Sequence, residues 1–78
     1  MDIEKIRETV KEIIIEKLGE NEINDDTRFI EDLIADSLDL AELMISVEIK
    51  FNIEVPKEDL NKISTFKDLV EYIDKKIN

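Results

Sequence analysis

Apolar side chains recur at helical spacing in three stretches of the chain. The first stretch predicts a helix from Asp2 to Leu18, with Asp2 as its N-cap and Gly19 at the left-handed position after the last turn. Its apolar stripe consists of Ile3, Ile6, Val10, Ile13, Ile14 and Leu18. We interpret this stripe as a face of the core.

The second stretch predicts a helix from Ser37 to Phe51, with Asp36 as its N-cap, and this helix is apolar on two sides. The core face consists of Leu40, Leu43, Met44, Val47 and Phe51. The second stripe consists of Leu38, Ala41, Ile45 and Ile49, with Glu42 inside it and Asp39 and Glu48 beside it. A domain of this size can hardly bury a helix on all sides, so we expect the second stripe to be an exposed docking surface. The alternative is that the preceding loop covers it.

The remaining pattern predicts a short helix and a third long one. After Pro56, which suits a first helical turn, residues 57–62 supply barely more than one turn, so we expect them to be the mobile part of the fold. The last helix runs from Phe66 to Ile77, and Thr65 with Asp68 resembles a capping box. Its core stripe consists of Phe66, Leu69, Val70, Ile73 and Ile77. The sequence therefore predicts one all-α domain over residues 1–78, a small bundle of three longer helices and one short helix.

Residues 19–36 form a long first loop, rich in the turn formers Asn, Asp and Thr. The apolar residues expected to fix it to the core are Ile23, Phe29, Ile30, Leu33 and Ile34. A connection of this length is often functional. A crossover that lets two helices run parallel explains it equally well.

The acidic residues are concentrated in one third of the chain. The net charge is −10, and residues 19–48 hold ten acidic residues and one basic residue, Arg28. This distribution attracts basic partners and repels nucleic acid and anionic membranes, although it also fits a merely soluble surface. The chain has no Cys and no His, which excludes a disulfide scaffold, a thiol nucleophile and a Ser-His-Asp triad. No apolar run is long enough to span a bilayer, so we expect a cytoplasmic protein. Because the common catalytic groups are missing, we also expect that it is not an enzyme.

Ser37 is the first candidate for chemistry because it starts a helix directly after the long loop. A helix N-terminus accommodates a phosphate ester, through its free N–H groups and its dipole. By position alone, a serine that merely begins a helix is the favoured interpretation of Ser37. Asp36 and Asp39 do not make it a nucleophile, because no obvious base activates the hydroxyl. Residues 24–28 lack the ligand spacing and central Gly of an EF-hand, so no metal site is expected.

The segment from Phe29 to Asp39 resembles the attachment site of acyl carrier proteins. Its centre is Asp36-Ser37-Leu38, and the resemblance continues through the rest of the chain. The positions that carry this continuation are Glu42-Leu43, Glu48, Phe51, Val55-Pro56, Lys62-Ile63 and Tyr72-Ile73. The resemblance covers essentially the whole chain and favours attachment over the plain helix-start reading of Ser37.

This resemblance implies that a holo-synthase transfers 4′-phosphopantetheine from coenzyme A to Ser37, with Asp36 helping to hold the synthase's magnesium ion. It further implies that the arm carries acyl chains for fatty acid synthesis. The implied partner-binding residues are Leu38, Asp39, Ala41, Glu42, Ile45 and Glu48, which would meet basic patches on partner enzymes. The implied acyl pocket is bordered by Val47, Val55, Leu60 and Ile63. A monomer without membrane insertion or nucleic-acid binding is expected.

Four positions depart from the family pattern. Ile34 stands where the family usually has Gly, Ile49 and Lys50 stand where acids often follow, and Leu60 is larger than the usual residue. These departures bear on partner preference and on pocket size. A specialised carrier of polyketide, aminoacyl or other groups stays an alternative, as does an unmodified acidic interaction protein.

Overall fold

The computed structural model describes residues 1–33 and 36–78, and of Ser37 the backbone only. It contains α1 (Ile3–Leu18), α2 (Ser37–Phe51), the short helix η1 (Lys57–Lys62) and α3 (Phe66–Ile77). The predicted all-α bundle of three longer helices and one short one is confirmed. The short helix is a 3₁₀ helix of six residues. None of the helices in the described part is long and apolar enough to cross a membrane.

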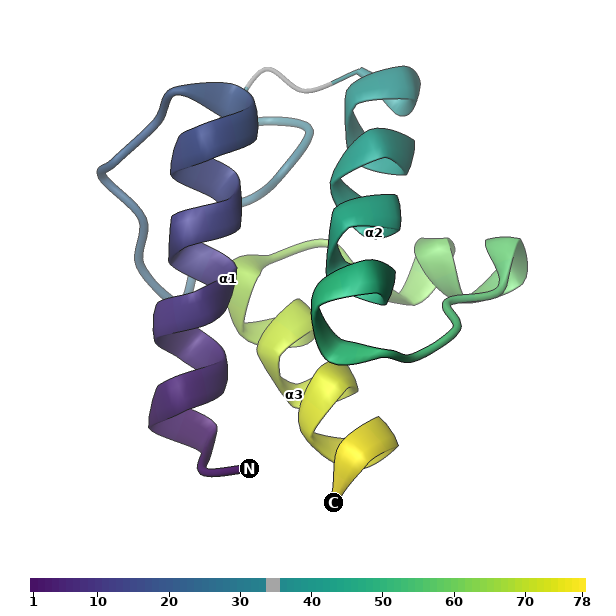
Figure 1. Cartoon of the computed structure of the whole chain (residues 1–78). Helices are drawn as coiled ribbons and strands as arrows, with labels where there is room; N and C mark the ends of the chain where they lie inside the picture. The colour runs from purple at the N-terminus through teal and green to yellow at the C-terminus, as the bar shows by residue number, and fades with distance from the viewer. Residues whose placement is uncertain (34–35) are drawn as a thin grey trace.

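The three α-helices pack side by side, with η1 at the edge of the bundle next to α2 (Figure 1). α1 runs toward the end of the molecule where α2 begins, and α2 runs back alongside it. The two helices are therefore antiparallel, and the idea of a crossover between parallel helices is wrong. The loop instead descends beside α1, contacts the start of α3, and returns toward α2.

Each long helix begins with the cap that the sequence predicts. The carboxylates of Asp2 and Asp36 accept from the backbone N–H groups of Glu4 and Asp39. Gly19 ends α1 in the left-handed conformation with φ 71°, where it lacks the steric penalty of a Cβ. Thr65 and Asp68 form a complete capping box at the start of α3.

The core is built from one face of each α-helix together with Phe29 and Ile63. The predicted stripes supply the buried residues Ile6, Val10, Ile13, Ile14, Leu43, Met44, Val47, Phe51, Phe66, Leu69, Val70 and Ile73. Leu18, Leu40 and Ile77 are half-buried at its margin. Two expectations are wrong, because Ile3 is 41% exposed and Ile30 is 52% exposed. Ile3 lies in the first turn of α1, at the end of the bundle. Ile30 lies in irregular backbone, where helical spacing does not predict which side chains face the core.

The long loop is fixed to the start of α3 by backbone hydrogen bonds. The N–H groups of Phe66 and Lys67 donate to the carbonyls of Thr27 and Asp25, at 2.9 and 3.1 Å. These N–H groups belong to the first turn of α3, which has no partners for them within the helix. The Phe29 N–H donates to the Ser64 carbonyl at 3.0 Å, beside a bridge between Arg28 and Thr65.

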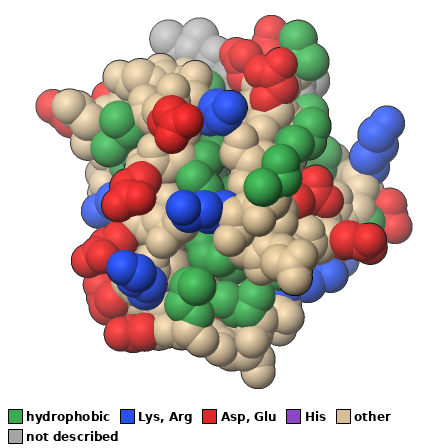
Figure 2. All heavy atoms as spheres, in the orientation of Figure 1, with side chains coloured by type: hydrophobic (Ala, Val, Ile, Leu, Met, Phe, Trp, Pro, Cys, Tyr) green, Lys and Arg blue, Asp and Glu red, His purple; other side chains and the backbone are tan. Residues whose placement is uncertain are grey.

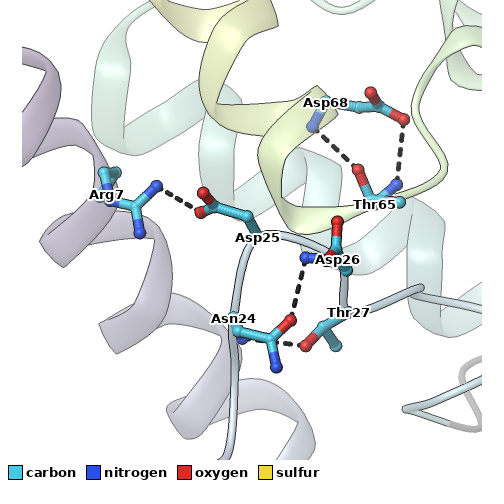
Figure 3. Close-up of polar contacts among 7 residues, drawn as sticks. All are labelled: Arg7, Asn24, Asp25, Asp26, Thr27, Thr65 and Asp68. Atoms are coloured by element: carbon cyan, nitrogen blue, oxygen red, sulfur yellow. Dashed lines mark hydrogen bonds and ion pairs between the residues drawn. The ribbon is translucent and has the colours of Figure 1, made fainter.

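Side chains hold the same region from the α1 side (Figure 3). Arg7 of α1 pairs with Asp25, and Asn24 closes a turn with Asp26 and Thr27. Of the predicted loop anchors, Phe29 is buried, and Ile23 and Leu33 are half-buried against the core. The predicted anchoring and backbone effect of Ile34 lie outside the described residues.

The capping box makes part of the stability depend on pH. Backbone hydrogen bonds from Ser64 and Thr65 hold the pKa of Asp68 below its usual value of 3.8. A lowered pKa stabilises the fold above the unfolded value, and this stabilisation is lost as pH falls through the folded pKa. We expect Asp68→Ala to lower the free energy of unfolding by about 1–2 kcal/mol at pH 7.

Urea denaturation at pH 7 and at about pH 3 measures this effect. The difference from the wild type should shrink at the acidic pH, because this pH lies below the usual value of 3.8 and part of the stabilisation from the lowered pKa is lost there. Glu71→Ala, at an exposed position of the same helix, should show no such pH dependence. An equal loss at both pH values would contradict the assignment to the charged carboxylate.

Candidate functional site

The start of α2 presents Ser37 as the first helical residue after an extended Asp36. The Asp36 carboxylate accepts from the Asp39 N–H at 2.9 Å, and its carbonyl accepts from the Leu40 N–H at 3.0 Å. The earlier N–H groups of the first turn have no partner within the helix. Together with the helix dipole, they favour an anionic substituent at this end.

The other two serines occupy different surroundings. Ser46 lies in the interior of α2, half-buried in a groove with Thr9 and Ile13 of α1. Ser64 is exposed, but its N–H donates to Asp68 and its carbonyl accepts from Phe29. Only Ser37 combines a helix start with the acidic, apolar face described next.

The second apolar stripe of α2 is exposed to solvent. Leu38, Ile45 and Ile49 have exposed fractions of 66%, 53% and 77%, so no described segment covers them. Figure 2 shows apolar side chains along the α2 side of the molecule, with acidic side chains beside them. The expectation that this stripe is exposed is confirmed. Of the other residues predicted to bind partners, Glu42 is exposed, and Asp39 and Ala41 are half-buried.

Glu48 is also half-buried, and its carboxylate is already engaged within the chain. Its Oε2 accepts from the Val55 N–H at 2.9 Å, and its backbone carbonyl accepts from Asn52 and Ile53. Glu48 therefore fixes the link that leaves α2, a role that sequence reasoning missed. The available signal in the sequence is a glutamate one turn before the short link of residues 52–56, and this pattern is too common to single out Glu48.

A solvent-open hollow of about 860 Å³ lies between α2, η1 and the long loop. Its lining consists of Arg28, Ile30, Glu31, Leu40, Ala41, Lys57, Leu60, Asn61, Ile63, Ser64 and Thr65. Leu40 and Ala41 follow Ser37 by three and four residues, so they lie about one helical turn along the same side of α2. The hollow is therefore within reach of a group attached to Ser37.

The predicted pocket residues divide between this hollow and the core. Leu60 and Ile63 line the hollow. Val47 is fully buried, and Val55 is half-buried against the core, and neither contributes to the lining. Arg28, Ile30 and Lys57 do contribute, and sequence reasoning missed them because they come from a loop and a short helix without an apolar period.

Two comparisons with known proteins agree with this geometry. A family model described as "Phosphopantetheine attachment site" matches residues 8–73, which include Ser37. A protein of Helicobacter hepaticus named "Acyl carrier protein" is 51% identical over 69 residues, which cover 86% of this chain and 91% of that protein. A Wolinella succinogenes protein of the same name is 46% identical over 71 residues, covering 88% of this chain and 93% of that protein.

The match thus spans the capped start of α2, the exposed stripe and the hollow together. A third relative, from Rickettsia canadensis and also named "Acyl carrier protein", is 44% identical and covers 90% of this chain. The chain belongs to the acyl carrier protein family, whose members carry a phosphopantetheine arm.

Proposed function

We propose that this chain carries acyl groups as thioesters on a 4′-phosphopantetheine arm attached to Ser37, and presents them to enzymes of fatty acid synthesis. The observation that carries the proposal is the position of Ser37. It begins an N-capped helix inside the matched segment, beside the exposed stripe and one turn from the hollow. The arm supplies a terminal thiol that holds the acyl group.

In this proposal the chain presents Ser37, and a transferase supplies the catalysis. The Ser37 oxygen forms a phosphoester bond, the adenosine bisphosphate of coenzyme A leaves, and the hydroxyl proton passes to the transferase. The chain has no His, and Asp36 next to Ser37 is engaged as a helix cap. Asp36 has a second carboxylate oxygen with which it can help hold the transferase's metal ion.

Partner enzymes dock on the exposed face of α2 in this proposal. Leu38 and Ile45 supply apolar contact area, Ala41 lies at its edge, and Asp39 and Glu42 supply negative charge close to Ser37. Charges at the rim of an interface raise the association rate more than the affinity. A carrier that must visit and leave several enzymes benefits from that balance, with basic patches as the complementary surface.

The hollow is the proposed resting place of the acyl chain. Its apolar wall includes Leu60 and Ile63, as well as Leu40 and Ile30. Because Val47 is fully buried, a chain contacts Val47 only after the bundle opens, and Val55 borders that route. Short chains therefore need less rearrangement than long ones.

Intact-mass measurement tests the function directly. The purified protein is incubated with coenzyme A and a broad-specificity phosphopantetheinyl transferase, and we expect a gain of one phosphopantetheine group. The modified protein should then accept one acyl group that hydroxylamine removes, as expected of a thioester. A well-folded sample that gains no mass with several transferases would leave an unmodified acidic binding protein as the better explanation.

The docking face predicts a charge effect on the modification rate. Glu42→Lys should lower kcat/KM for the transferase by about three- to tenfold at low salt, because it reverses a charge at the proposed interface. Initial rates at several salt concentrations measure this, and the defect should shrink as salt screens both proteins. Glu71→Lys, an equal charge change at an exposed position of α3, is the control and should keep the wild-type rate. Equal rates for both variants would remove α2 from the docking surface.

A further inference from the structure

The short helix η1 forms one wall of the hollow but is weakly built. Lys57, Leu60 and Asn61 of η1 line the hollow. None of its six residues is buried, and Pro56 provides no side-chain cap. At its two ends, the Asp59 N–H donates to the Pro56 carbonyl and the Ile63 N–H donates to the Leu60 carbonyl. An isolated turn of this kind is marginal in water.

One side-chain hydrogen bond connects η1 to α3. The Tyr72 hydroxyl donates to Asp59 Oδ2 at 2.6 Å. The Asp59 side chain is only 18% exposed, and Tyr72 is half-buried against the core. A short hydrogen bond to a carboxylate is among the stronger kinds, and this one joins η1 to α3.

Burial, the hydrogen bond itself and the neighbouring charges keep Tyr72 protonated and Asp59 ionised. Burial and the hydrogen bond to Asp59 raise the pKa of Tyr72 to about 12, and the charges of Glu48 and Glu58 add to the shift. The hydrogen bond from Tyr72 lowers the pKa of Asp59, with Lys62 and Lys76 acting in the same direction. The hydroxyl therefore keeps its proton and the carboxylate stays ionised throughout the neutral pH range.

We propose that the hydrogen bond between Tyr72 and Asp59 is a latch that positions η1 as the wall of the hollow and so controls how well an attached acyl chain is shielded. Tyr72 and Asp59 are positioning residues, because neither lines the hollow. The effect on η1 stands on the contacts above. The effect on the acyl chain rests on the proposed function.

Hydrogen exchange of the unmodified protein tests the effect on η1. In Tyr72→Phe and in Asp59→Ala, the backbone amides at positions 59 and 63 should exchange about tenfold faster than in the wild type. The Leu69 amide, bonded to the Thr65 carbonyl in α3, should keep its rate. The double variant should exchange no faster than the single ones, because both substitutions break the same bond.

Glu58→Ala is the matched control, since it removes a neighbouring acid of η1 that forms no side-chain hydrogen bond within the described residues. It should exchange like the wild type. Unchanged exchange in Tyr72→Phe, or additive effects in the double variant, would overturn the latch.

Thioester cleavage tests the effect on the acyl chain. With an octanoyl group on the modified protein, hydroxylamine should cleave the thioester several-fold faster in Tyr72→Phe than in the wild type. An acetyl group, too short to need the hollow, should be cleaved at equal rates. Equal octanoyl rates together with faster exchange would overturn the shielding role. A protein that cannot be modified at all would contradict the proposed function, while the exchange experiment would still decide the latch.

Discussion

Ser37→Ala is expected to abolish attachment of the phosphopantetheine arm completely. The chain contains three serines, and only Ser37 begins a helix. Alanine removes the oxygen that forms the phosphoester and leaves the Asp36 cap intact, because that cap uses the Asp39 N–H. Intact mass after incubation with coenzyme A and the transferase measures the result.

The other serines provide matched controls for this experiment. Ser46→Ala and Ser64→Ala should each gain one phosphopantetheine group. Ser46 lies in the groove toward α1, and Ser64 lies between η1 and α3. Circular dichroism should show that all three variants keep their helices. Loss of modification in either control, with Ser37→Ala still modified, would move the attachment site away from α2.

Phe66→Ala is expected to lower the free energy of unfolding by about 3–5 kcal/mol. The Phe66 side chain has no exposed surface. The Cζ atom of Arg7 and the Nζ atom of Lys11, both on α1, lie 5.5 and 5.9 Å from the centroid of its ring. Its N–H also holds the long loop, through the Thr27 carbonyl. A domain of this length is typically stable by about 4–12 kcal/mol, so this loss should remove a large fraction of the total stability.

Urea denaturation followed by circular dichroism measures the loss. Phe66→Leu, which retains most of the buried volume, should cost less than about 1.5 kcal/mol and keeps the test informative if the alanine variant does not fold. Ile49→Ala, at a side chain that is 77% exposed, should change stability by less than about 0.5 kcal/mol. Similar losses at Phe66 and Ile49 would contradict the assignment of core and exposed face.

The extent of the helices was predictable because their signals are local. Helical spacing of apolar residues, the caps at Asp2 and Asp36, and the Thr65–Asp68 box each depend on residues within a few positions of each other. Exposure of the second stripe of α2 also followed from the sequence, because a chain of 78 residues cannot cover every apolar side.

The candidate site was only partly predictable. Asp36, Ser37 and the docking face share one helix, so the pattern brings them together without knowledge of the fold. The lining of the hollow combines a loop, α2 and η1, and no periodicity links Arg28 or Lys57 to Leu40. For the same reason, periodicity could not show that Val47 is fully buried or that Val55 packs against the core, outside the residues that line the hollow.

The sequence by itself therefore determined the helices, their caps, the position of Ser37 and the acidic, apolar face beside it. The tertiary structure decided the direction of α2, the course of the long loop, the engagement of Glu48 with Val55, and the bond from Tyr72 to Asp59. The physical reason is the range of the interactions. Helix formation and capping are local in sequence, whereas a loop carbonyl or a carboxylate can pair with any donor that packing brings within reach.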